Sequence, residues 1–140
     1  MRRLILSLAV LAGLAFVPPR LHGSWTDPLP DALRTDAPPA ARQYWRELVS
    51  CTGIRPHRGR GFGSIAWYRV HGRQFTRPDN GRSVIGLWIR PGNAVVLSSA
   101  WYDDERLIKH EMLHVLLQRG SHDDPHFQAA GGMECGLYPS

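Results

Sequence analysis

At 140 residues the chain is long enough for one domain with a modest core and too short for two. Its apolar fraction of 43% and its five tryptophans indicate a packed globule and exclude a disordered polypeptide. The formal net charge of +5 comes from arginines spread along the chain rather than from one basic block. Such a distribution is weak evidence for nucleic-acid binding, and we expect no nucleic-acid partner.

The first 22 residues have the composition of an export signal. Arg2 and Arg3 form a positive start, the apolar run 4–17 follows, and Pro18-Pro19 ends it. The run is shorter than the roughly 20 residues that a membrane span requires. We therefore predict a signal peptide in residues 1–22 and a secreted or periplasmic protein, with an uncleaved membrane anchor through the apolar run as the alternative.

Export changes the interpretation of the two cysteines, Cys51 and Cys135. In an oxidising compartment, two cysteines so far apart in sequence favour one disulfide that ties the C-terminal tail to the first helix. Two buried free thiols, and zinc ligation by Cys135, are the alternatives.

The domain itself is predicted over residues 40–140, after an extended linker in the proline- and aspartate-rich segment 23–39. Its first element is an amphipathic helix that begins at Pro38-Pro39 and continues to Val49, because apolar residues recur there at helical spacing. These residues are Ala41, Tyr44, Trp45, Leu48 and Val49.

Three or four strands are predicted next, from apolar stretches that lie between turn signals. They cover residues 64–70, 74–76, 84–89 and 95–99. A helix, a mostly antiparallel sheet and a later helix together predict an α+β domain.

The most informative segment is His110-Glu111-Met112-Leu113-His114. Positions four apart lie on one face of an α-helix, so His110 and His114 can direct imidazole nitrogens at one Zn²⁺ about 2.0–2.1 Å away, with Glu111 beside the open position of the metal. Water on zinc ionises near neutral pH, and a carboxylate in hydrogen-bond reach can take its proton. The segment therefore predicts a zinc-dependent hydrolase with Glu111 as general base.

The surrounding sequence places this segment on a buried helix. Asp103 or Asp104 can cap its start, and the helix is predicted to run to Arg119 with Gly120 as its C-cap. Two histidines and a glutamate would be costly on such a helix without a metal or another partner. The apolar stripe that buries the helix consists of Leu113, Leu116 and Leu117, widened by Met112 and Val115.

A catalytic zinc usually has three protein ligands and one open position, so a third ligand is needed. We expect His122, because Gly120 ends the helix just before it and lets the chain turn back toward the helix face. His126 is the next candidate, and one of these two histidines can instead stabilise an oxyanion. An aspartate of this C-terminal loop can also hydrogen-bond a ligand imidazole. The remaining candidate ligands are Asp123, Asp124 and Glu134.

The helical segment resembles the signature of the zincin metallopeptidases. Together with His122, Phe127 and Cys135 it is similar to small exported bacterial proteins that carry the same HEMLH segment, and the resemblance covers roughly residues 41–136. It implies a zincin-like fold in which an edge strand near the metal helix holds an extended peptide. It also implies an exported zinc metallopeptidase that acts on a peptide or protein, with His110 and His114 as ligands and Glu111 as general base.

Two other functions remain open from the sequence. The bacterial endoribonucleases of ribosomal RNA maturation have helical histidines followed by a third histidine and acidic residues, similar to His114, His122 and Asp123-Asp124. They are cytoplasmic, however, and carry glycine where this chain has Glu111. The other alternative is an extracytoplasmic binding domain stabilised by zinc, for which four protein ligands rather than three plus water would be diagnostic.

Overall fold

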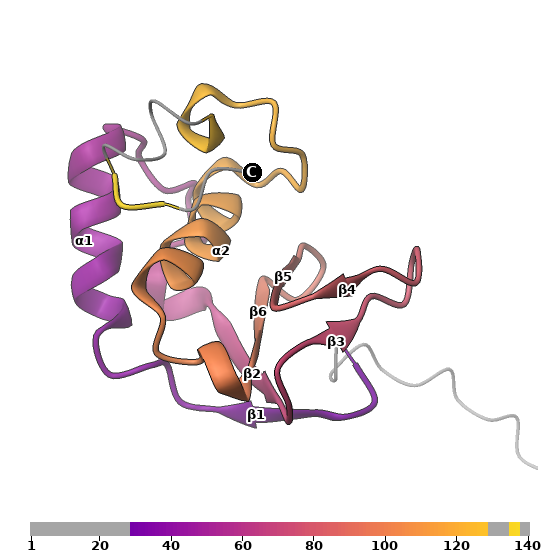
Figure 1. The fold of residues 1–140 in the computed structure, drawn as a ribbon. Coiled ribbons are helices and arrows are strands. Elements are labelled where there is room, and N and C mark those ends of the chain that lie inside the picture. The colour runs from indigo at the N-terminus through magenta and orange to yellow at the C-terminus, as the bar shows by residue number, and fades with distance from the viewer. Residues whose placement is uncertain (1–28, 129–134, 138–140) are drawn as a thin grey trace, which may run out of the picture.

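The computed structural model describes residues 29–128 and 135–137 (Figure 1). The predicted signal segment 1–22 and the candidate ligand Glu134 lie outside these residues. Two helices cover one face of a four-stranded sheet, and a second, two-stranded sheet lies beside it (Figure 1). Within the described ranges, no helix is long and apolar enough to cross a membrane.

The first helix, α1 (Ala41–Thr52), confirms the predicted amphipathic helix and extends it by a few residues. Its buried residues, Ala41, Trp45 and Leu48, recur at intervals of three and four and therefore share one face. The helix ends at Gly53, whose φ of 67° is left-handed and whose N–H donates to the carbonyl of Val49. This backbone conformation costs glycine little, which explains why the helix stops there.

The second helix, α2 (Glu105–Leu117), carries the histidine segment. Its start agrees with the prediction, because the carboxylate of Asp104 accepts the N–H of Leu107 at 2.9 Å. The predicted end at Arg119, with Gly120 as cap, is wrong. Gln118 takes the left-handed conformation instead, with φ of 54°, and its side-chain amide donates to the carbonyl of Val115 at 2.6 Å. That hydrogen bond satisfies a terminal carbonyl of the helix.

The main sheet has the strand order β1-β2-β6-β5. β2 and β6 run parallel, whereas β1 and β5 are antiparallel to their neighbours. The predicted α+β class with a mostly antiparallel sheet is therefore confirmed. The strands are β1 (Ala32–Thr35), β2 (Ala66–Val70), β6 (Ala94–Ser98) and β5 (Gly86–Ile89).

β1 lies in a segment that the sequence analysis assigned to an extended linker. Its four residues pair with β2 from Ala32 opposite Val70 to Thr35 opposite Trp67. Leu29 and Ala32 are buried beside Tyr68, so this part of the segment belongs to the packed domain. A four-residue edge strand flanked by proline and aspartate has too little alternation to be recognised from sequence.

The predicted strand at residues 74–76 does not join the main sheet. It forms β3 (Phe75–Thr76), which pairs antiparallel with β4 (Ser83–Val84) in a hairpin of its own. Arg77 stabilises the turn between them, because its guanidinium is 2.9 Å and 2.5 Å from the two carboxylate oxygens of Asp79. β4 is followed almost directly by β5, so the hairpin stands next to the edge of the main sheet (Figure 1).

β6 separates two apolar clusters and is buried along its whole length. Val95 and Leu97 face the helices, where they pack in one cluster with Met112, Leu113 and Leu116. The alternate residues of β6 face away from the helices and pack with β3 and the segment before β1. Because both faces are covered, β6 is apolar from Ala94 to Leu97 rather than alternating, and its last residue, Ser98, is buried with its hydroxyl bonded to the carbonyl of Arg73.

A disulfide joins Cys51, near the end of α1, to Cys135 in the C-terminal tail. The predicted pairing is confirmed, and both free thiols and zinc ligation by Cys135 are excluded. A stable disulfide indicates an oxidising environment, as is found outside the cytoplasm.

Candidate metal centre

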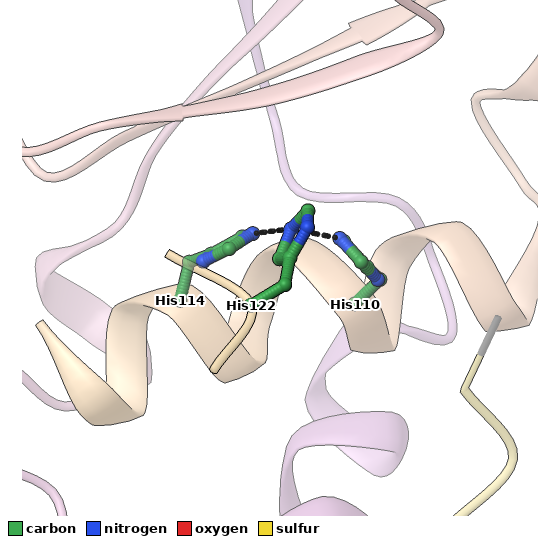
Figure 2. Close-up of side chains that lie close together, drawn as sticks. All are labelled: His110, His114 and His122. Atoms are coloured by element: carbon green, nitrogen blue, oxygen red, sulfur yellow. Dashed lines mark hydrogen bonds between the residues drawn. The ribbon is translucent and has the colours of Figure 1, made fainter. Parts of the chain in front are cut away.

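Three histidines converge on one point beside α2 (Figure 2). His110 and His114 lie one turn apart on the helix, and His122 approaches from the loop that follows it. The Nε2 atom of His122 is 3.1 Å from Nε2 of His110 and 3.0 Å from Nε2 of His114. The structure thus brings together the three residues that the sequence analysis placed at a metal.

The loop holds His122 in place through Phe127 and Gln128. The side-chain amide of Gln128 donates to the carbonyl of His122 at 2.9 Å. Phe127 is fully buried, and its ring centroid lies 4.6–5.0 Å from the centroids of all three imidazoles. The phenyl ring therefore packs against the whole cluster and limits how far any of its rings can turn.

The tautomer of His114 is fixed by a backbone carbonyl. Nδ1 of His114 is 2.7 Å from the carbonyl oxygen of Arg119, which can only accept, so Nδ1 carries the hydrogen. Nε2 then presents its lone pair to the centre of the cluster. Burial, with smaller contributions from neighbouring positive groups, lowers the pKa of this imidazole to about 3, so the ring is neutral at physiological pH.

Coordination of one metal ion explains the arrangement of the three nitrogens better than hydrogen bonds between the imidazoles do. A ring nitrogen has either one hydrogen or one lone pair in the ring plane, so His122 Nε2 cannot make ordinary hydrogen bonds to both neighbours. One cation accepts all three lone pairs. Zinc–nitrogen bonds of about 2.0–2.1 Å in a tetrahedron place ligand nitrogens about 3.3 Å apart. Two separations here, 3.0 Å and 3.1 Å, are close to that value, and all three nitrogens lie within 4.8 Å of one another. An all-imidazole set suits Zn²⁺ and related transition metals.

Glu111 follows the first histidine on α2 and is buried against the edge strand β5. The backbone N–H of Trp88 hydrogen-bonds the carboxylate, and Arg77 lies near enough to favour its charged form. Burial opposes both effects and raises the pKa of Glu111 to about 8. A Cβ atom at Gly86 would lie 2.6 Å from Oε1 of Glu111, so only glycine lets the carboxylate occupy this position.

Trp88 and Asn93 position the ring of His114 from the sheet side. The Trp88 side chain stacks on His114 with ring planes 6° apart and centroids 6.2 Å apart. Its indole N–H donates to Oδ1 of Asn93 at 3.2 Å, and the Asn93 amide donates to Oγ of Ser64 at 2.9 Å. Neither residue was predicted from the sequence. One local feature could have indicated Asn93. It lies in a turn and has a φ of 46°, which asparagine tolerates better than most residues.

A cavity of about 310 Å³ opens beside the cluster. Its walls come from α2, from β5 and from the start of the loop that carries His122, so the histidines and Glu111 share one cavity with the edge of the sheet. We call it the metal cavity. The ionisable side chains that line it are His110, Glu111, His114, His122 and Arg77.

The other predicted ligands in the described ranges point elsewhere. His126 contacts Asp124, whose Oδ1 is 2.7 Å from His126 Nδ1, and Asp123 accepts a hydrogen bond from Ser121. Neither aspartate bonds a clustered imidazole. The carbonyl of Arg119 takes that role, because the early end of α2 brings it beside His114.

No protein-family model, curated protein or solved structure matches this chain. Its function is therefore inferred from the chemistry of the metal cavity.

Proposed function

We propose that this protein is an exported zinc-dependent metallopeptidase of zincin-like fold. One observation carries the proposal: three imidazole Nε2 atoms converge beside a buried carboxylate within one cavity. This combination supplies a ligand set for zinc and a neighbouring proton acceptor. The disulfide supports an extracytoplasmic location, and the predicted signal segment 1–22 is consistent with it.

His110, His114 and His122 would hold the ion through Nε2. When bound, zinc supplies a Lewis acid that polarises a carbonyl and lowers the pKa of water to about 7. Glu111 would accept the proton of the water that attacks the peptide carbonyl and return it to the amine released when the C–N bond breaks. This role requires the ionised carboxylate, which the positive charge of a bound cation would favour against the burial that raises its pKa. The hydrogen bond of Glu111 with the backbone of Trp88 keeps the carboxylate at the wall of the metal cavity throughout.

The edge strand β5 supports a peptide as the substrate. The backbone N–H of Ser98 donates to the carbonyl of Ile85 at 2.9 Å, so in the antiparallel register Gly86 and Trp88 direct their backbone groups away from β6. The N–H of Trp88 bonds Glu111, so a peptide would pair with the remaining outward groups. That outer edge borders the metal cavity. An extended chain can pair with the edge and bring a carbonyl to the metal, as the resemblance to zincins implies.

Two features favour this function over the alternatives. Within residues 29–128 and 135–137, the cluster contains three metal-binding side chains, the number that a catalytic zinc with one position for water requires. A purely structural zinc site would close that position. Glu111 and the disulfide in turn argue against a cytoplasmic endoribonuclease, whose helix carries glycine at this place.

Metal content and peptide hydrolysis, measured on the same preparations, test the proposal. The wild type is expected to bind one zinc per chain and to cleave a mixed library of quenched fluorescent peptides. Glu111→Gln should retain zinc and lose at least about 100-fold in kcat, as general-base loss predicts. His122→Ala should lose zinc, whereas His126→Ala on the same loop should lose neither property. Undiminished turnover in Glu111→Gln refutes the assigned base, and unchanged zinc affinity in His122→Ala refutes the third ligand.

A further inference from the structure

A second, larger cavity lies on the face of the main sheet that the helices do not cover. Its volume is about 570 Å³. Arg34, Tyr68, Val96 and Leu87 are opposite one another on successive strands, so they form a row across this face from β1 to β5. We call this the outer cavity. Its apolar floor consists of Ala66, Tyr68, Leu87, Ile89 and Ala94.

The outer cavity and the metal cavity meet at β5. Arg77, Leu87 and Trp88 line both of them. Successive side chains of a strand point to opposite faces, so Leu87 belongs to the outer floor while Trp88 stacks on His114. A chain bound at the edge of β5 can therefore pass from the histidines onto the outer face without leaving the surface of the protein.

The rim of the outer cavity is positively charged. It carries three arginines, Arg34, Arg77 and Arg90, against one carboxylate, Asp79. Asp79 is engaged by Arg77 in a two-point ion pair. Arg34 and Arg90 are exposed, and in the described part of the chain neither forms an ion pair of its own. Two guanidinium groups thus remain to bind anions above an apolar floor.

We propose that the outer cavity is an acidic-peptide subsite of the metallopeptidase. The substrate is an extended peptide with an apolar side chain on the floor and aspartate or glutamate carboxylates at Arg34 and Arg90. The inference rests on the proposed function, because it names the substrate class of that same site. A peptide fits better than a single-stranded nucleic acid, which needs exposed aromatic rings for stacking, whereas Tyr68 is only 3% exposed.

Peptide binding and turnover together test this proposal. The probes are three fluorescein-labelled peptides with the same apolar core, in which the flanking residues are glutamate, glutamine or lysine. Binding is measured by anisotropy on zinc-loaded Glu111→Gln protein, which does not consume the probe. We expect the glutamate peptide to bind at least about tenfold more tightly than the lysine peptide, and the difference to shrink at high salt.

Matched variants locate the effect. Arg34→Gln/Arg90→Gln should abolish the preference for glutamate, whereas Arg55→Gln/Arg58→Gln removes the same charge from exposed arginines outside both cavities and should leave it intact. An equal loss in both double variants, or no preference in the parent, overturns the acidic subsite. Displacement of the peptide by an oligothymidylate at equal phosphate-to-carboxylate ratio also overturns it, in favour of a general polyanion site.

Cleavage of the three peptides by the wild-type protein distinguishes failure of the acidic subsite from failure of the proposed function. If it cleaves the peptide set without regard to flanking charge, only the acidic subsite fails. If it cleaves no peptide while zinc is bound, the metallopeptidase proposal fails, and the subsite fails with it as a substrate site.

Discussion

At the scale of single residues, the candidate base depends on the absence of a side chain in the facing strand. A Cβ at Gly86 would lie 2.6 Å from Oε1 of Glu111 and 2.8 Å from Cδ1 of Leu107. Both neighbours are buried, so neither can move aside freely. The position of the carboxylate is therefore set by β5 as much as by α2.

Gly86→Ala is expected to displace Glu111 while leaving the histidines in place. We expect peptide cleavage to fall at least about tenfold with zinc content unchanged, and stability to fall by about 1–3 kcal/mol from overpacking. Kinetics, metal analysis and urea denaturation check this. The matched control is Gly63→Ala, where an added Cβ meets nothing within 4 Å. Full activity in Gly86→Ala would show that the carboxylate is not required where it lies.

The sequence predicted those parts of the site whose positions follow from local backbone geometry. Helical periodicity alone places His110 and His114 on one face, and the helix end just before His122 lets it return. Trp88, Asn93 and the carbonyl of Arg119 could not be predicted in the same way. Their contacts join residues far apart in the sequence, such as Asn93 and Ser64, 29 positions apart, or depend on the exact residue at which α2 ends.

At the scale of elements, a buried cation, Lys109, joins the two helices. Nζ of Lys109 is 2.8 Å from Glu47 on α1 and 2.6 Å from Glu105 on α2, and it lies 5.4 Å from the ring centroid of Tyr44. The Lys109 side chain is only 6% exposed, whereas both carboxylates keep contact with water. The helix pair that presents the histidines is thus coupled through one charge.

Lys109→Met removes this charge and keeps the apolar stem. The hydrogen bond from Lys109 lowers the pKa of Glu47 below its ordinary value of about 4.5. Because folding lowers the pKa of Glu47, the ion pair stabilises the fold at pH values above the ordinary pKa. This stabilisation is lost as the pH falls through the lowered pKa of the folded state. We expect Lys109→Met to be less stable than the wild type at pH 6, and the difference to narrow toward pH 3.

Urea denaturation across that pH range measures the effect of Lys109→Met. Arg82→Met, which removes an exposed charge in the turn between β3 and β4, should follow the wild-type pH dependence. A stability difference that stays constant from pH 6 to pH 3 would contradict a contribution from the Lys109–Glu47 pair.

The elements themselves were predictable in proportion to their regularity. α1 and α2 have helical periodicity, and β2, β5 and β6 lie in apolar stretches between turn signals. β1 was not predicted, and β3 was predicted without its pairing to β4, because tertiary pairing rather than local preference makes these short segments strands. The end of α2 was misplaced because Gln118 adopts a conformation usually taken by glycine.

At the scale of the whole molecule, the disulfide closes a loop that spans most of the domain. It links residues separated by 84 positions, and α2, the strands from β2 to β6 and all three clustered histidines lie within that loop, whereas β1 and nearly all of α1 precede it. Closing so long a loop removes much of the freedom of the unfolded chain. The fold is therefore expected to depend on the oxidising environment that export provides.

Cys51→Ala/Cys135→Ala should lower the free energy of unfolding by about 4–5 kcal/mol, the loop-closure value for a ring of this length. Guanidinium denaturation with and without reductant measures it. The reduced wild type should match the double variant, and reductant should not affect the variant. Equal stability of oxidised and reduced wild type would contradict the stabilising role of the crosslink.

The account of function depends on one shared ion between His110, His114 and His122. Anomalous diffraction from zinc-replete crystals, collected on both sides of the zinc absorption edge, tests this directly. We predict one anomalous peak about 2.0–2.1 Å from the three Nε2 atoms, with a remaining coordination position that faces the metal cavity. A fully ordered cluster without a peak, or a zinc ion bound elsewhere on the chain, would contradict the account.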